Sequence, residues 1–141
     1  MSPSESPPLR LSSPLRGLFW LLITALLSGV IFHLSSGPIT APMPPIPHID
    51  KAIHASIYAL LAISAALCAR HLFTALTRPE WWGALYAALY GASDEWHQTF
   101  VPSRYADIWD WLADVAGAIL AVWALKKYGK LKETGASPQT P

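Results

Sequence analysis

The sequence predicts an all-α integral membrane protein, built as a bundle of four helices. Hydrophobic residues make up 52% of the chain and charged residues only 13%, whereas an average soluble domain carries about 25% charged residues. Long apolar segments recur along the chain, and it contains seven tryptophans, a residue enriched at membrane surfaces. The 141 residues allow one membrane domain, predicted at residues 15–128 between disordered tails at 1–14 and 129–141.

Charge and cysteine content narrow the range of functions. The formal net charge is +1, so overall charge gives no indication of a nucleic-acid partner. Cys68 is the single cysteine and cannot form an intrachain disulfide; among Ala and Leu it is expected to be an inert, packed thiol. The chain has no Cys/His zinc spacing, glycine-rich phosphate loop or GxSxG motif.

The first two spans are predicted on either side of a proline-rich loop. Residues 17–34 contain no Asp, Glu, Lys or Arg and would form about 27 Å of helix, close to the thickness of a bilayer core. A signal peptide is the alternative, but its apolar core is usually about 7–15 residues long. Residues 37–47 carry five prolines and cannot be helical, which leaves a plain linker or a lid. The second span follows at residues 52–69.

The third and fourth spans flank a short polar turn. The third begins at Trp81, but only residues 81–92 are apolar, whereas crossing needs about twenty residues. The third helix is therefore expected to carry Asp94, Glu95 and His97 into the outer part of the membrane, and Val101-Pro102 is expected to end it. A turn at residues 103–106 leads to the fourth span at 107–125, which lysines follow.

Basic residues in the short flanks predict the orientation of these spans. A four-span arrangement leaves only Lys51 and Arg104 on one side of the membrane. The other side collects Arg10, Arg16, Arg70, Arg78, Lys126, Lys127, Lys130 and Lys132. Both termini are therefore predicted to lie in the cytoplasm, with the chain in the cytoplasmic (inner) membrane.

Polar residues from three separate stretches are expected at one depth on the opposite, outward-facing side. Charged side chains near a bilayer centre cost roughly 2.5–3.5 kcal/mol each, and such residues are by default read as a functional site inside a bundle. Helical spacing puts the members of each stretch on one face, except Glu95, which is rotated about 100° from Asp94. The candidate ligand-binding residues are Lys51, His54, Tyr58, Asp94, Glu95, Gln98, Arg104, Asp107, Asp110 and Asp114.

The chemistry of these residues leaves several roles open. Carboxylates that share a face repel each other and need cations or protons. The guanidinium of Arg104 is suited to bidentate pairing with a carboxylate or a phosphate. The candidates for a divalent metal site are His54, Asp94 and His97, and the catalytic candidates are His54, Asp94, His97 and Asp110. A buried polar clasp that only holds the helices together is an equal alternative for Asp94 and Asp110.

Taken together, these residues resemble the VanZ-like family of small multi-pass membrane proteins. The resemblance covers residues 50–117. It is carried by Lys51-x-x-His54-x-x-x-Tyr58, Asp94-Glu95-x-x-Gln98-x-Phe100-x-Pro102-x-Arg104 and Asp107-x-x-Asp110-x-x-x-Asp114-x-x-Gly117. Ser103 stands where family members often have Gly, and Asp114 where they often have Asn. The resemblance implies an integral cytoplasmic-membrane protein, and the founding member is associated with low-level resistance to the glycopeptide teicoplanin.

Three functions are compatible with these observations. The first is recognition of an anionic envelope lipid or lipid-linked glycan precursor, with Arg104 and Lys51 holding phosphate. The second is a membrane enzyme acting on a lipid headgroup, with His54 or His97 as general base or metal ligand. The third is a structural scaffold for envelope proteins. No cofactor is evident, although the His and Asp residues allow a divalent metal.

Overall fold

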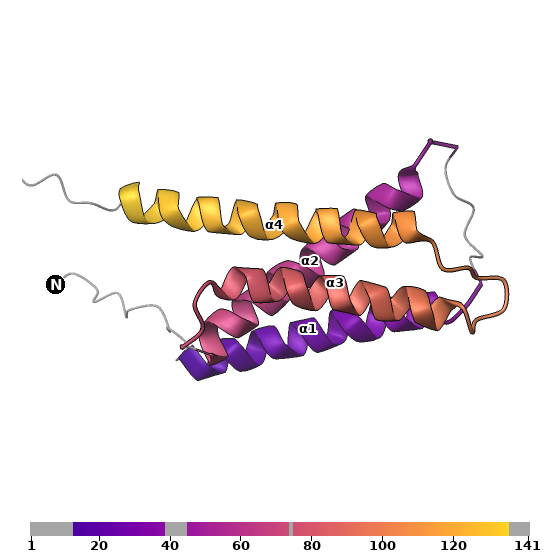
Figure 1. The fold of residues 1–141 in the computed structure, drawn as a ribbon. Coiled ribbons are helices and arrows are strands. Elements are labelled where there is room, and N and C mark those ends of the chain that lie inside the picture. The colour runs from indigo at the N-terminus through magenta and orange to yellow at the C-terminus, as the bar shows by residue number, and fades with distance from the viewer. Residues whose placement is uncertain (1–12, 39–44, 74, 136–141) are drawn as a thin grey trace, which may run out of the picture.

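Four helices that alternate in direction form the structure, a computed structural model that describes residues 13–38, 45–73 and 75–135. They are α1 (Ser13–Ser35), α2 (Ile49–Leu72), α3 (Pro79–Gln98) and α4 (Ile108–Gly135), and the described part contains no strand. The start of α1 and the end of α4 lie at one end of the bundle, and the α3–α4 connection lies at the other (Figure 1). The predicted all-α four-helix bundle is confirmed.

The central helix is α2, which contacts each of the other three. Its buried face includes Leu61 and Ala62, both fully shielded from solvent. Glycines on the neighbouring helices allow the close approach, since a Cβ at Gly83 or at Gly117 would overlap the backbone of α2. Small residues at helix interfaces are the usual means by which membrane helices pack closely.

The helix boundaries differ from the predicted spans in a few places. α3 begins at Pro79, a favoured first helical residue, and ends at Gln98, before the Val101-Pro102 pair that was expected to end it. α4 continues to Gly135, through residues 129–135 that the sequence assigned to a tail, because Lys, Leu and Glu in this stretch favour helix. The rest of both tails, Arg10, and residues 39–44 of the proline-rich loop lie outside the described residues.

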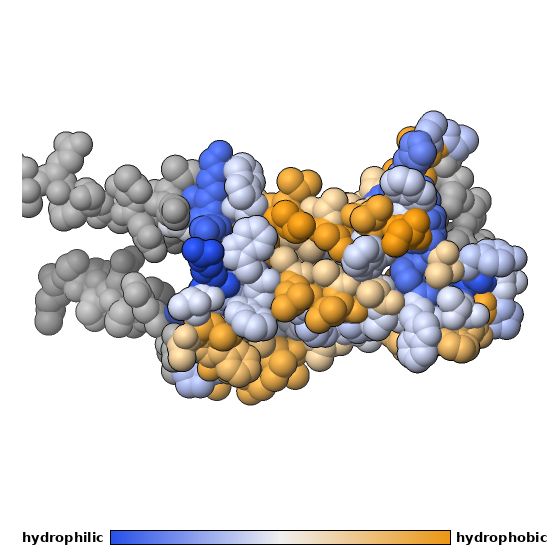
Figure 2. Space-filling model, viewed as in Figure 1, coloured by the Kyte–Doolittle hydropathy of each residue, from blue (hydrophilic) through white to orange (hydrophobic). Residues whose placement is uncertain are grey.

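Three helices of the described part are long and apolar enough to cross a membrane, at Pro14–Ser35, Ile49–Leu72 and Ile108–Gly129. α3 is not among them: it carries acids at both ends, although its 20 residues extend about 30 Å along its neighbours. Hydrophobic side chains cover the middle of the visible face, with hydrophilic ones at both ends (Figure 2). The protein is therefore a membrane protein in which the more polar α3 packs among three apolar helices.

Candidate functional site

Polar residues of α2, α3 and α4 meet at the end of the bundle where α3 ends and α4 begins. The ammonium group of Lys51 lies 2.6 Å from Asp107 Oδ2, 2.8 Å from Asp110 Oδ1 and 3.0 Å from Asp50 Oδ2. We refer to these four residues as the Lys51 cluster. One cation thus joins the first turn of α2 to the start of α4, and it neutralises only part of the negative charge around it.

Asp107, just before α4, has three partners: the Trp109 N–H, Glu95 and Lys51. Its Oδ1 accepts a hydrogen bond from the Trp109 N–H at 2.8 Å, which is the usual geometry of a helix N-cap. Its own N–H donates to Glu95 Oε2 at 2.7 Å, so α3 holds the same residue. The Lys51 ammonium, followed by the Trp109 N–H, lowers the pKa of the Asp107 carboxyl below its ordinary value. Asp107 is therefore ionised at neutral pH.

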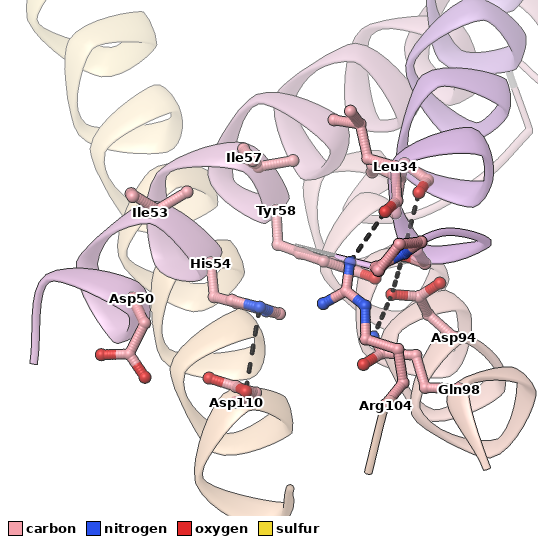
Figure 3. A pocket seen from close by; sticks show the side chains of 13 residues that line it. Leu34, Asp50, Ile53, His54, Ile57, Tyr58, Asp94, Gln98, Arg104 and Asp110 are labelled. Carbon is pink, nitrogen blue, oxygen red and sulfur yellow. Dashed lines mark hydrogen bonds and ion pairs between the residues drawn. The ribbon is translucent and has the colours of Figure 1, made fainter. Parts of the chain in front are cut away.

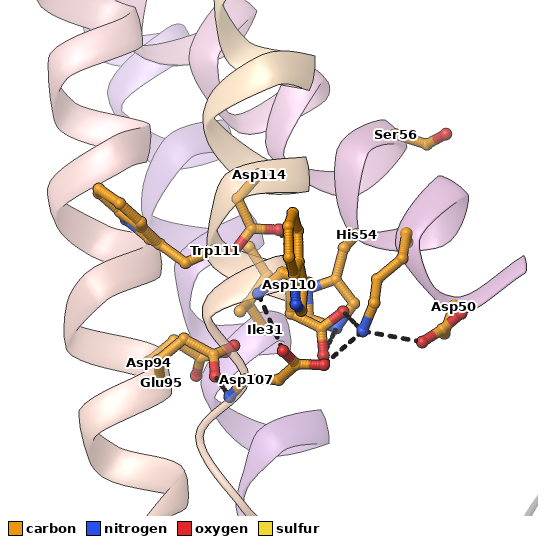
Figure 4. Close-up of polar contacts among 12 residues, drawn as sticks. Ile31, Asp50, His54, Ser56, Asp94, Glu95, Asp107, Asp110, Trp111 and Asp114 are labelled. Carbon is orange, nitrogen blue, oxygen red and sulfur yellow. Dashed lines mark hydrogen bonds and ion pairs between the residues drawn. The ribbon is translucent and has the colours of Figure 1, made fainter. Parts of the chain in front are cut away.

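A second polar group lies beside the first and deeper in the bundle. His54 Nδ1 is 3.0 Å from Asp114 Oδ1, and His54 Nε2 is 3.9 Å from Asp110 Oδ2. One nitrogen or oxygen atom each of His54, Glu95 and Asp114 lie within 4.8 Å of one another. We call these three residues the His54 cluster (Figure 4). Its two acids are almost completely buried, with 7% of Glu95 and 1% of Asp114 exposed.

Asp94 belongs to a third set of contacts, on the side of α3 that faces α1. Its Oδ2 accepts hydrogen bonds from Ser35 Oγ at 2.9 Å and from Gln98 Nε2 at 3.2 Å. The same face of α3 also contacts α1 through Tyr90, whose hydroxyl donates to the Ser28 carbonyl oxygen at 2.6 Å. Asp94 therefore links α1 to α3, whereas the neighbouring Glu95 turns toward the start of α4.

A pocket of about 370 Å³ opens among these groups (Figure 3). It is bounded by parts of all four helices and by the α3–α4 connection, and its lining combines apolar and polar residues. The apolar lining residues are Ile31, Leu34, Pro38, Ile53 and Ile57. The polar lining residues are Ser35, Asp50, His54, Tyr58, Asp94, Gln98, Arg104 and Asp110. We call this space the site pocket.

Arg104 donates to backbone carbonyl groups at the end of α1. Its Nε donates to the Gly37 carbonyl oxygen at 3.0 Å and its Nη2 to the Leu34 carbonyl oxygen at 2.8 Å, and the guanidinium extends toward the end of α1 (Figure 3). A cation at this place satisfies carbonyl groups that a helix C-terminus leaves without partners. No ion pair joins Arg104 to a carboxylate among the described residues, so of the two partners that the sequence left open, a carboxylate is not found there.

His97 lies apart from His54. Its ring stacks on Phe32 at 4.6 Å between ring centroids, and its Nε2 is 3.1 Å from Ser36 Oγ. The candidate metal set of His54, Asp94 and His97 is therefore not assembled in the described part of the chain. The reason is the packing of α3: the stripe that Asp94 shares with His97 contacts α1, and of these two residues only Asp94 also lines the site pocket.

A comparison with protein-family models identifies the family. The model described as VanZ/LLP1 matches residues 19–129, which include most of the bundle and the whole site. The chain belongs to the VanZ/LLP1 family. No curated protein and no solved structure matches it. The resemblance seen in the sequence is thus confirmed, and the VanZ/LLP1 match extends well beyond the motifs that carried it.

Two residues of this VanZ/LLP1 site were not singled out from the sequence. Asp50 pairs with Lys51 and lines the site pocket; its position next to Lys51 could have indicated it. Ser35 donates to Asp94 from the last turn of α1. A single hydroxyl at the end of an apolar span gives no sequence signal, because serine is common in membrane helices without any role in a site.

Proposed function

We propose that this VanZ/LLP1 protein binds the headgroup of an envelope lipid, either an anionic lipid or a lipid-linked glycan precursor, in the site pocket. The observation that carries the proposal is the divided lining of that pocket, at the polar end of a hydrophobic belt (Figure 2). Ligand sites are typically mostly apolar clefts with a few placed polar groups. A lipid presents the matching division between acyl chain and headgroup.

The polar lining favours a headgroup that combines hydroxyl groups with phosphate. Asp94 and Asp110 are acceptors for hydroxyl donors, and Arg104 supplies a cation in the pocket wall. Lys51, which the sequence suggested as a phosphate ligand, already contacts three carboxylates and suits a structural role better. One available cation beside several acceptors fits a glycan precursor with a phosphate link better than a simple anionic lipid.

Charge placement supports an orientation for this binding site. The described basic residues at the end of the bundle away from the site include Arg16, Arg70, Arg78, Lys126 and Lys127. Positive residues in short flanks prefer the cytoplasm, so we infer cytoplasmic termini, an inner-membrane location and a pocket that opens toward the cell envelope. For the cell, we propose that this lipid binding is linked to glycopeptide (teicoplanin) resistance.

The proposal is tested by filling the apolar part of the pocket. Ile53→Trp adds a large side chain to the lining, and Leu60→Trp is the matched control, because Leu60 lies two turns along the same face of α2 and is exposed. Each protein is purified in mild detergent, and its bound lipids are measured by mass spectrometry. We expect Ile53→Trp to lose a glycan-bearing or anionic lipid that the parent protein and Leu60→Trp retain.

A second variant tests the polar residues of the pocket lining. Arg104→Gln removes the cation and keeps a hydrogen-bond donor for the Leu34 carbonyl, so bound lipid is compared at matched thermal stability. Equal lipid content in the parent protein, Ile53→Trp and Arg104→Gln would contradict lipid recognition and favour the scaffold function. Turnover of the bound lipid by the parent protein would instead favour the membrane enzyme.

A further inference from the structure

We propose that the His54 cluster is a binding site for one divalent transition-metal ion, with ligands from a ring nitrogen of His54, Glu95 Oε1 and Asp114 Oδ2. This inference stands independently of the proposed lipid binding. The three residues come from α2, α3 and α4, so the site would join the three helices that form the polar end of the bundle.

The first support is geometry. One potential ligand atom each from His54, Glu95 and Asp114 can be chosen so that the three lie within 4.8 Å of one another. Metal–nitrogen and metal–oxygen bonds of about 2.0–2.2 Å place the ligands of a tetrahedral ion about 3–4 Å apart. Side-chain adjustments of about 1 Å would therefore bring three ligand atoms into position around an ion.

The second support is charge. Lys51 forms ion pairs with Asp50, Asp107 and Asp110. Among the described residues, neither Glu95 nor Asp114 forms an ion pair with a lysine or arginine. Two carboxylates held together in a buried place strongly favour a proton or a cation, since burial and like charge both penalise the ionised pair. A divalent ion supplies the missing positive charge in one step.

The third support is the hydrogen bonding of the two carboxylates. Glu95 Oε2 accepts from the Asp107 N–H, and Asp114 Oδ1 is bonded to His54. The second oxygen of each carboxylate, Glu95 Oε1 and Asp114 Oδ2, is buried without a partner among the described residues. Metal-ligating carboxylates are commonly held in this way, with hydrogen bonds that orient the group and leave an oxygen for the ion.

The fourth support is the open space beside the His54 cluster at Gly91. A Cβ on Gly91 would lie 3.0 Å from Asp114 Oδ2 and 3.2 Å from the Tyr58 ring, so glycine keeps this place open. The Tyr58 hydroxyl is also buried without a described partner, and Tyr58 lines the site pocket. It is thus placed to hydrogen-bond to a ligand that reaches the ion from the pocket.

The ligand set selects the class of ion. One imidazole nitrogen and two carboxylates suit Mn²⁺, Fe²⁺ or Zn²⁺, whereas Mg²⁺ and Ca²⁺ prefer sites made only of oxygen. Three protein ligands leave at least one coordination position for water or for a group in the pocket. Such an ion could polarise a phosphate ester, which links the site to the enzymatic alternative.

The test uses the full-length protein in detergent, stripped of metal with a chelator. Mn²⁺ and Zn²⁺ are titrated by calorimetry, and bound metal is counted by mass spectrometry after gel filtration. We expect one ion per chain. His54→Gln and Asp114→Asn should each weaken binding at least about tenfold. His97→Gln is the matched control, since it removes a histidine at the same end of the bundle outside the cluster, and should bind as the parent protein does.

Either of two binding results would overturn the site. One is substoichiometric binding of both Mn²⁺ and Zn²⁺ by the parent protein. The other is an equal loss of affinity in His97→Gln and His54→Gln. If the cluster variants do not fold, the parent protein alone decides: either ion should raise its thermal midpoint, with reversal by chelator, and the absence of any rise with both ions overturns the proposal.

Discussion

The interface between α2 and α4 has two halves that are held together differently. In its apolar half, Gly117 lies against the backbone of Ala55, and Leu61 and Val122 are completely buried. In its polar half, Lys51 bridges carboxylates, and His54 contacts Asp114. The apolar half depends on shape alone. The polar half carries more negative charge than its one lysine neutralises, which favours an additional proton or cation there.

The largest effect is expected from breaking the apolar half with Gly117→Ala. The added Cβ would meet the backbone of Ala55, which cannot rotate away, so the helices must separate; overpacking of this kind costs about 2–3 kcal/mol. Gly129→Ala is the control, because a Cβ there has no described atom within 4 Å, and replacing glycine within a helix usually stabilises by about 0.5–1 kcal/mol. Unfolding in mixed micelles by SDS titration measures both.

These two glycine variants should change stability in opposite directions. Equal effects would mean that the close approach of α2 and α4 does not determine the packing. The polar half would then have to hold the two helices together by itself.

The next effect is expected from the Lys51 cluster. Lys51→Met leaves Asp107 and Asp110 without their cation and should lower the unfolding free energy by about 1–2 kcal/mol, less than for a fully buried pair because 24% of the lysine side chain is exposed. Lys127→Met, at an exposed lysine far along α4 from the cluster, should change the unfolding free energy by less than about 0.5 kcal/mol. The same SDS titration makes the comparison, and similar values for the two variants would show that the cluster carries no net stabilisation.

Much of the fold was predictable because long apolar segments of the sequence indicate membrane helices. Apolar segments and their proline breaks placed all four helices, with α1 and α2 beginning and ending within four residues of the predicted spans. The far end of α4 was harder to predict. The lysines after residue 125 indicate where the apolar segment ends, but a helix rich in Lys and Leu can continue into a polar environment.

For the site, the sequence could predict only which residues share a helix face. Periodicity shows that Asp94 and His97 share one face and that Glu95 lies on another, but it does not show which helix each face meets. The structure turns the Asp94 face toward α1 and Glu95 toward α4. Likewise, a sequence shows that Arg104 is a cation without showing that carbonyl oxygens at the end of α1 are its nearest acceptors.

The smallest effect on stability is expected within the polar half of the α2–α4 interface, where two of its carboxylates, Asp110 and Asp114, can be compared. Asp110→Asn removes a carboxylate that Lys51 neutralises, and should destabilise the metal-free protein by about 1 kcal/mol. Asp114→Asn removes a carboxylate buried beside Glu95 and keeps an acceptor for His54, so its metal-free stability should stay within about 0.5 kcal/mol of the parent protein or increase. Thermal unfolding after chelator treatment measures both. A loss for Asp114→Asn as large as for Asp110→Asn would show that Asp114 is a structural partner of His54, because a carboxylate retained for a ligand is not needed for folding when the ligand is absent.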